Sequence, residues 1–70
     1  MEYLIAVFPK SRTVLVDDSP EGKTNTVLNL SKGTYTISLD PTADVRPKEI
    51  TITLKGTTAV APKKVRFEPV

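Results

Sequence analysis

The chain has 70 residues and a net charge of +2, from 10 basic and 8 acidic side chains, and it contains neither cysteine nor histidine. These features exclude a disulfide framework, a structural zinc site of the usual kind and nucleophilic catalysis by a Ser–His or Cys–His pair. A chain of this length makes one domain, which we assign to residues 1–70, and its core supplies a stability of roughly 3–5 kcal/mol.

The first predicted strand is Tyr3–Phe8, a continuous run of apolar residues. Successive side chains of a strand point to opposite faces, so this strand has two apolar faces. Two interpretations remain open. The strand is central, with its outer face covered by loops or the C-terminal tail, or its outer face is a self-association surface.

The next strands are predicted at Arg12–Asp17 and Thr26–Leu30. Between them, Asp18–Gly22 is predicted to form a turn-rich loop, because Asp, Ser, Pro and Gly favour turns. The segment Ser31–Gly33 is predicted to be a tight hairpin connection in which Gly33 takes a positive φ.

The remaining strands are predicted at Thr34–Asp40, Glu49–Leu54 and Lys63–Glu68, where apolar and polar residues alternate. This alternation predicts one buried and one exposed face on each strand, with Tyr35 and Phe67 pointing inward. The fold class is therefore all-β, a small antiparallel β-sandwich of about six short strands, with a small β-barrel as the alternative.

Between residues 14 and 54 the segments that bear on a family resemblance are, in order, Val14–Asp18, Gly22–Thr24, Val27–Leu30, Lys32–Leu39 and Ile50–Leu54. Their order resembles a PEGA-type module, a small β-sandwich of the transthyretin-like and carboxypeptidase-regulatory-like group. In this sequence Asp18 stands where that family usually has glycine, and Asn25 where it usually has proline. The resemblance implies an accessory or interaction module, often in cell-envelope or surface proteins, with no catalytic residue.

No run approaches the length of about 20 apolar residues that a membrane helix needs. Tyr3–Phe8 is too short for the core of a signal peptide, and Glu2 precedes it in place of a basic residue. A complete chain of this kind is expected in the cytoplasm, whereas an excised PEGA-like module is expected in the cell envelope or outside the cell.

Three carboxylates, Asp17, Asp18 and Glu21, lie close together in the sequence. They suggest either a calcium site or a turn in which aspartate caps backbone amides, and we predict the turn. Gly22–Thr24 resembles the end of a phosphate-binding loop, but position 17 is not glycine and a strand follows. We therefore predict no catalytic residue, no metal ion, no cofactor and no small-molecule substrate.

Basic residues gather near the end of the chain, at Lys55, Lys63, Lys64 and Arg66. They are interpreted as a charged strand edge that discourages aggregation, or as a face for nucleic acid, to which Lys10 and Arg12 would add. The second interpretation corresponds to a small basic β-barrel.

The preferred functional hypothesis is a non-enzymatic interaction or structural module that binds a protein partner or a second copy of itself. Binding would use a sheet edge, with Tyr3–Phe8 and Lys63–Arg66 as candidate edges, or a sheet face. Nucleic-acid binding through the C-terminal Lys/Arg face is the alternative. The predicted interface residues are Tyr3, Ile5, Val7, Lys63, Lys64 and Arg66.

Overall fold

The structure, a computed structural model, describes residues 1–70 and contains nine β-strands and no helix, which confirms the all-β class. The structure contains no helix long and apolar enough to cross a membrane. In chain order the strands are β1 Glu2–Val7, β2 Thr13–Val16, β3 Ser19–Lys23, β4 Val27–Leu30, β5 Gly33–Asp40, β6 Val45–Arg46, β7 Glu49–Leu54, β8 Lys63–Arg66 and β9 Glu68–Pro69.

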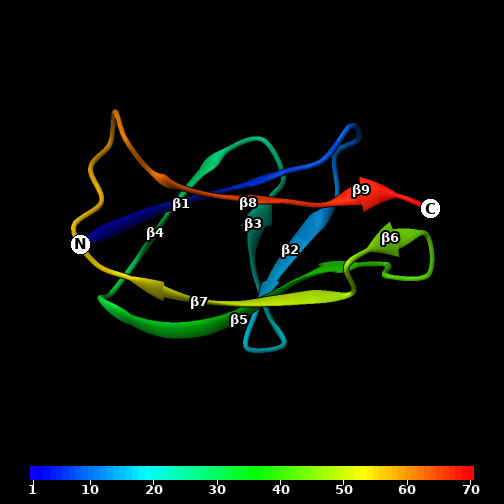
Figure 1. Ribbon diagram of the computed structural model, residues 1–70, viewed down its shortest axis with the longest axis horizontal. Helices are drawn as coiled ribbons and strands as arrows, with labels where there is room; N and C mark the ends of the chain where they lie inside the picture. The colour runs from blue at the N-terminus through cyan, green and yellow to red at the C-terminus, as the bar shows by residue number, and fades with distance from the viewer.

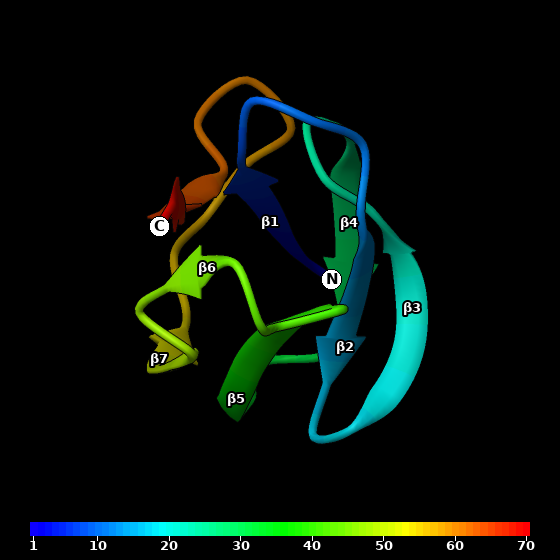
Figure 2. The ribbon, with the colours of Figure 1, turned by 90° about the vertical axis from the view of Figure 1, so that its right-hand side faces the viewer.

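The strands form two packed sheets and one short pair. One sheet has the order β4-β1-β8, the other has the order β3-β2-β5-β7, and β6 pairs with β9. Figure 2 shows the four-stranded sheet curving around one side of the molecule, from β3 to β7. Both sheets keep free edges, so the fold is an open sandwich and not the closed barrel of the alternative prediction.

The core lies between the two sheets and contains 13 buried apolar side chains. Alternation along the strands selects them, because every second residue faces inward. The prediction that Phe67 is a core residue is confirmed, since it is only 1% exposed, and Tyr35 packs against the core at its margin. The fully buried members with the largest side chains are Phe67, Leu4, Ile37, Leu39, Leu54 and Val14.

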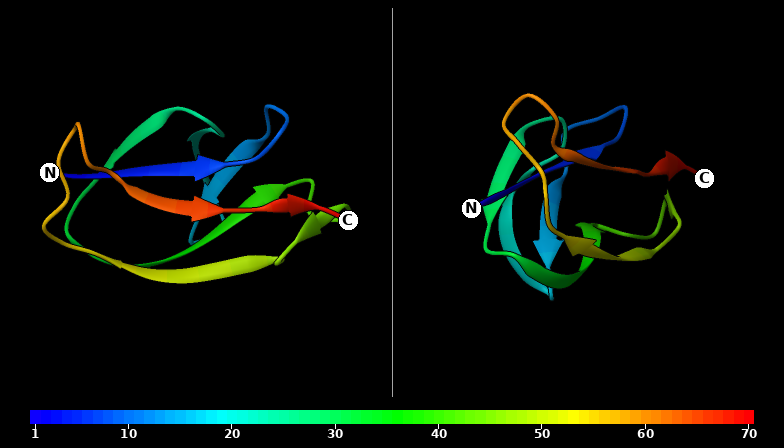
Figure 3. Two further views of the ribbon diagram at one scale, coloured as in Figure 1. Left: turned by 45° about the horizontal axis from the view of Figure 1, so that its top comes forward. Right: turned by 60° about the vertical axis from the view of Figure 1, so that its left-hand side comes forward.

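The first and last long strands pair in parallel, which is the one parallel contact in the fold. Figure 3 shows β1 and β8 side by side and pointing the same way, and Figure 1 shows the chain termini at opposite ends of the molecule. β1 therefore lies between β4 and β8. The prediction that Tyr3–Phe8 is a candidate edge was wrong, because both sides of β1 already have a partner strand.

The predicted loop Asp18–Gly22 is instead mostly a strand, β3, which pairs with β2. Asp17 and Asp18 have φ values of 50° and 67°, as a two-residue type I′ hairpin turn requires. The register shifts at Glu21, so β3 carries a β-bulge. Pro20 is tolerated because β3 is an edge strand, where a missing N–H breaks no ladder bond.

The prediction of a tight hairpin at Ser31–Gly33 was also wrong. β4 pairs with β1, whereas β5 pairs with β2 and β7, so this connection crosses from one sheet to the other. Gly33 has a φ of 159°, close to extended backbone. The Tyr35 hydroxyl donates a 2.6 Å hydrogen bond to the Ser31 carbonyl oxygen, which holds the crossing against the start of β5.

Asn25 fastens the start of β4 to the end of β1. Its backbone N–H donates to the Ala6 carbonyl at 2.7 Å. Its side chain then pairs with Phe8 twice: Nδ2 donates to the Phe8 carbonyl at 2.7 Å, and Oδ1 accepts from the Phe8 N–H at 3.3 Å. Asn25 has a φ of 65°, a left-handed conformation that Asn tolerates better than most residues.

We predict that Asn25→Ala lowers the free energy of unfolding by about 2–3 kcal/mol. Alanine loses both side-chain hydrogen bonds, and it adopts a positive φ less readily than asparagine does. Asn25→Gly relieves the backbone but still loses the bonds, so a loss of about 1–2 kcal/mol is expected. Urea unfolding measures both. Asn29→Ala, an exposed position in β4, is the control, and an equal loss there would contradict the assignment.

We predict that Asp18→Gly raises the free energy of unfolding by up to about 1 kcal/mol, because glycine adopts the positive φ of this turn without strain. Asp17→Gly should not give this gain. Asp17 Oδ1 accepts a 2.9 Å bond from the Thr36 N–H, which glycine would lose. Equal thermal shifts for the two variants in calorimetry would argue against this reading of the turn.

Candidate interaction surface

The outer face of the β4-β1-β8 sheet carries a row of apolar side chains. Tyr3, Ile5 and Val7 alternate with the buried Leu4 and point away from the core, where they remain half-buried. In the neighbouring strand, Val27 lies directly opposite Ile5 and is 47% exposed. We call Tyr3, Ile5, Val7 and Val27 the outer apolar stripe.

Basic residues border this stripe on one side only. Lys64 lies opposite Ile5 and Arg66 lies opposite Val7, so both point to the outer face and both are exposed. Lys63 lies opposite Leu4 and therefore belongs to the other side of the sheet. The structure thus brings together all the predicted interface residues except Lys63.

Val27 is the surface residue that the sequence analysis missed. The strand that contains it was predicted, but nothing in the sequence showed that this strand pairs with β1. Only the register Ile5–Val27 places the two side chains next to each other. The one signal in the sequence was the alternation of Val27 and Asn29 with Leu28 and Leu30, which puts Val27 on the more polar face of its strand.

The outer face of the other sheet has a different character. Thr34 and Thr53 lie opposite each other and share a 3.1 Å hydrogen bond, and Thr36 and Thr51 share one of 3.2 Å. Paired threonines of this kind suit a solvated sheet face. The facing pairs of β5 and β7 are therefore polar on this face, in contrast to the apolar row that β1 presents.

An open groove of about 550 Å³ lies at the end of the stripe, between the end of β1 and the β8–β9 segment. Val7 and Pro9 line one side, and Arg66, Glu68 and Pro69 line the other. Enclosed ligand sites bury most of the surface of a small molecule. This groove is open to solvent and extends the outer apolar stripe instead of enclosing a reaction site.

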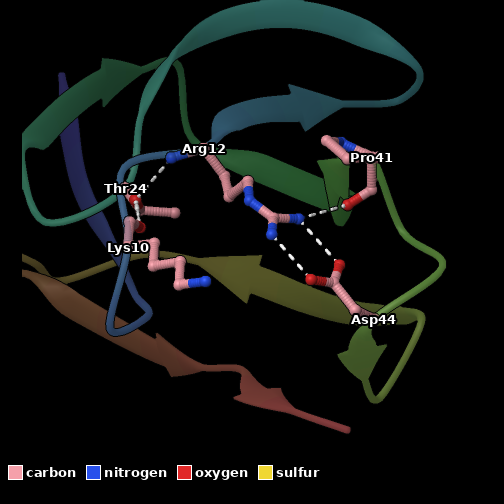
Figure 4. Close-up of polar contacts among 5 residues, drawn as sticks. All are labelled: Lys10, Arg12, Thr24, Pro41 and Asp44. Atoms are coloured by element: carbon pink, nitrogen blue, oxygen red, sulfur yellow. Dashed lines mark hydrogen bonds and ion pairs between the residues drawn. The ribbon is translucent and has the colours of Figure 1, made fainter.

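Arg12 is engaged in a structural contact (Figure 4). Its Nη1 and Nη2 donate to the two carboxylate oxygens of Asp44 at 2.8 and 2.7 Å, and Nη1 also reaches the Pro41 carbonyl at 3.1 Å. The guanidinium lies 5.2 Å from the centre of the Phe8 ring. The hydrogen bonds from Arg12 lower the pKa of Asp44 to about 2. Arg12 is thus committed to holding the loop before β6 against the start of β2.

The segment Gly22–Thr24 has a structural role as well. Thr24 is buried, donates from Oγ1 to the Lys10 carbonyl at 2.7 Å and accepts from the Arg12 N–H at 3.0 Å (Figure 4). A Cβ on Gly22 would collide with the side chain of Leu28, so this glycine permits close packing of β3 under β4. Thr24 thus stabilises the turn before β2, whereas Gly22 serves the packing between the sheets.

Thr57 fixes the loop between β7 and β8 to the start of β1. Its N–H and its hydroxyl donate to Glu2 Oε1 at 2.9 and 2.6 Å, and its hydroxyl oxygen accepts from the Tyr3 N–H at 2.7 Å. The hydrogen bonds from Thr57 lower the pKa of Glu2. This contact positions the chain just before β8 enters the sheet.

The carboxylates of the predicted turn are oriented by the hairpin. Asp17 Oδ1 accepts a hydrogen bond from the Thr36 N–H at 2.9 Å, and the Asp17 N–H donates to the Thr36 carbonyl at 2.9 Å. The structure contains no group of three or more acidic side chains close enough to hold a metal ion. Asp17 thus caps a backbone amide, as the turn interpretation predicted.

Comparison with known proteins gives no match: no family model, no curated protein and no solved structure matches this chain. The resemblance to PEGA-type modules therefore stays a prediction.

We predict that stability falls with acid between about pH 4 and pH 2. The pKa of Asp44 is about 2 in the folded chain, below its ordinary value of 3.8, so this contribution is present above pH 4 and is lost as pH falls through 2. Asp44→Asn should therefore unfold at a lower urea concentration than the natural chain at pH 6. The urea midpoints of the two proteins should converge near pH 2. Because Asp44 is half-exposed, salt should weaken the effect.

Glu21→Gln is the control for this experiment, because Glu21 is an exposed carboxylate without a salt bridge. At pH 6, where Asp44→Asn should lower the urea midpoint of unfolding, Glu21→Gln should leave that midpoint close to the value of the natural chain. Curves for Asp44→Asn and the natural chain that stay parallel down to pH 2 would contradict the prediction.

Proposed function

We propose that this chain is a non-enzymatic interaction module that binds protein through the outer face of the β4-β1-β8 sheet. In its simplest form, a second copy of the chain packs against this face. The observation that carries the proposal is the outer apolar stripe, which runs across the central strand β1 and the edge strand β4 and stays partly exposed to solvent.

Burial of apolar surface provides the driving force. Removing such surface from water is favourable by about 25 cal/mol per Å². The stripe combines one aromatic and three β-branched side chains, and its border is charged on the β8 side. An apolar centre with a polar rim is the usual anatomy of a protein interface.

The chemistry of the chain also supports a binding role. Histidine and cysteine are absent, so the usual nucleophile and base pairs are not available. The one groove is open, and no pair of carboxylates flanks it. Support for nucleic-acid binding is weaker, because Arg12 is held by Asp44, while Phe8 and Phe67 are buried and offer no ring for base stacking.

We predict that the molar mass in solution rises with concentration from 7.7 kDa toward twice that value, as measured by size-exclusion chromatography with light scattering. Ile5→Glu should keep the chain monomeric, because it places a charge at the centre of the stripe. The fold should persist, since the new carboxylate would lie opposite Lys64.

Thr51→Glu is the matched control, because it adds the same charge to the outer face of the other sheet. It should associate like the natural chain. A natural chain that stays monomeric at all concentrations would overturn the self-association form of the proposal. Equal effects of Ile5→Glu and Thr51→Glu would show that net charge, and not the stripe, controls association.

A further inference from the structure

One edge of β8 carries unpaired backbone groups. The Phe67 N–H donates to the Val7 carbonyl at 2.9 Å, so this residue faces β1. Backbone groups of successive residues in a strand alternate in direction, so Val65 faces β1 as well. The N–H and C=O groups of Lys64 and Arg66 must then project from the opposite side, where β8 has no partner strand.

The continuation of this edge already accepts a strand. Just past β8, the chain pairs with β6 in an antiparallel register that places Arg46 opposite Glu68. The Val70 N–H donates to the Asp44 carbonyl at 3.0 Å as part of this pairing. After Arg46 the chain leaves for β7, so the line of β6 ends where the open edge of β8 begins.

The charge at this edge is strongly positive. Lys63, Lys64 and Arg66 make up three of the four residues of β8, and all three are exposed. None of them forms a salt bridge, because the one ion pair in the structure joins Arg12 to Asp44. Two copies of β8 paired with each other would bring like charges into contact, which is destabilising. The occupant that this edge suits is therefore acidic and is not a second β8.

We propose that the open edge of β8 binds an extended acidic segment of a partner protein, which adds as an antiparallel strand in line with β6. This proposal rests on the proposed function, because both treat the chain as an interaction module. The strand-addition site is nevertheless a different surface from the outer apolar stripe. Guest residues beside Lys64 and Arg66 point to the outer face and are acidic. The guest residue between them lies beside Val65, points toward the core and is apolar.

The test uses a short capped peptide in which valine and glutamate alternate, titrated into the isotope-labelled chain and followed by NMR. Strand addition should protect the Lys64 and Arg66 amides from hydrogen exchange by about tenfold or more, with affinity on the order of millimolar or tighter. The Val65 and Phe67 amides should already exchange slowly without peptide. A peptide with lysine in place of glutamate is the ligand control and should not bind.

Two pairs of variants separate charge from backbone pairing. Arg66→Glu should weaken binding by about tenfold, whereas Lys23→Glu, the same charge change on the distant strand β3, should not. Lys64→Pro should bind at least about tenfold more weakly than Lys64→Ala, because proline removes the N–H that faces the guest strand. This N–H makes no bond within the sheet, so the fold should tolerate its loss.

Backbone methylation of the peptide repeats the test from the ligand side and does not depend on the folding of any variant. Methyl groups on alternate amides should abolish binding in one of the two possible patterns and leave it intact in the other. Equal binding by both methylated peptides would overturn strand addition. Protection of the Lys64 and Arg66 amides that depends on protein concentration without peptide would instead identify a second copy at the edge and would also overturn the proposal.

Val27→Glu distinguishes this proposal from the proposed function, because Val27 lies on β4, on the far side of β1 from β8. It should abolish self-association and leave peptide binding unchanged. Loss of peptide binding with Lys64→Pro and retained association would show the edge and the face to be separate sites. If an oligonucleotide displaced the peptide and backbone methylation of the peptide did not change its binding, the edge would be assigned to nucleic acid. That result would overturn the proposal.

Discussion

The parallel pairing of β1 with β8 is the contact on which the rest of the structure depends. It completes a three-stranded sheet, whereas β1 and β4 alone would form a two-stranded hairpin-like unit of marginal stability. It also brings Val65 and Phe67 into the core between the sheets. Because the two strands lie near opposite ends of the chain, their pairing closes a loop of nearly the whole chain, and non-local contacts of this kind favour slow folding.

This pairing also determines the surface. An apolar strand placed in the middle of the sheet buries one face and presents Tyr3, Ile5 and Val7 on the other. β8 then becomes the edge strand, and its basic side chains stand beside that stripe. Basic residues on an edge discourage non-specific pairing with other sheets, yet they also select for an acidic guest strand. One arrangement of strands thus gives the apolar face and the charged edge.

Hydrogen bonds from polar side chains hold distant segments of the chain together, a role that disulfides have in many small domains. Asn25 joins β4 to the end of β1, Thr24 and Arg12 hold the turn before β2, and Thr57 joins the last long loop to Glu2. Every one of these bonds links segments that are distant in sequence. No buried side-chain polar atom lacks a hydrogen-bond partner, so the small core loses no stability to unsatisfied groups.

The sequence by itself determined the all-β class, the positions of six of the nine strands and the inward residues such as Ile37, Leu39 and Phe67, because period-two alternation is a local property. It also selected most of the outer surface residues, since apolar side chains on both faces of Tyr3–Phe8 stand out. Only the tertiary structure decided which strands are neighbours. The β3 strand was hidden by its turn-forming composition, and the crossing at Ser31–Gly33 looked like a hairpin. The pairing of β4 with β1 places Val27 in the stripe, and the pairing of β1 with both β4 and β8 makes β1 central. Pairing and register depend on contacts between segments far apart in the chain, for which a local pattern carries no signal.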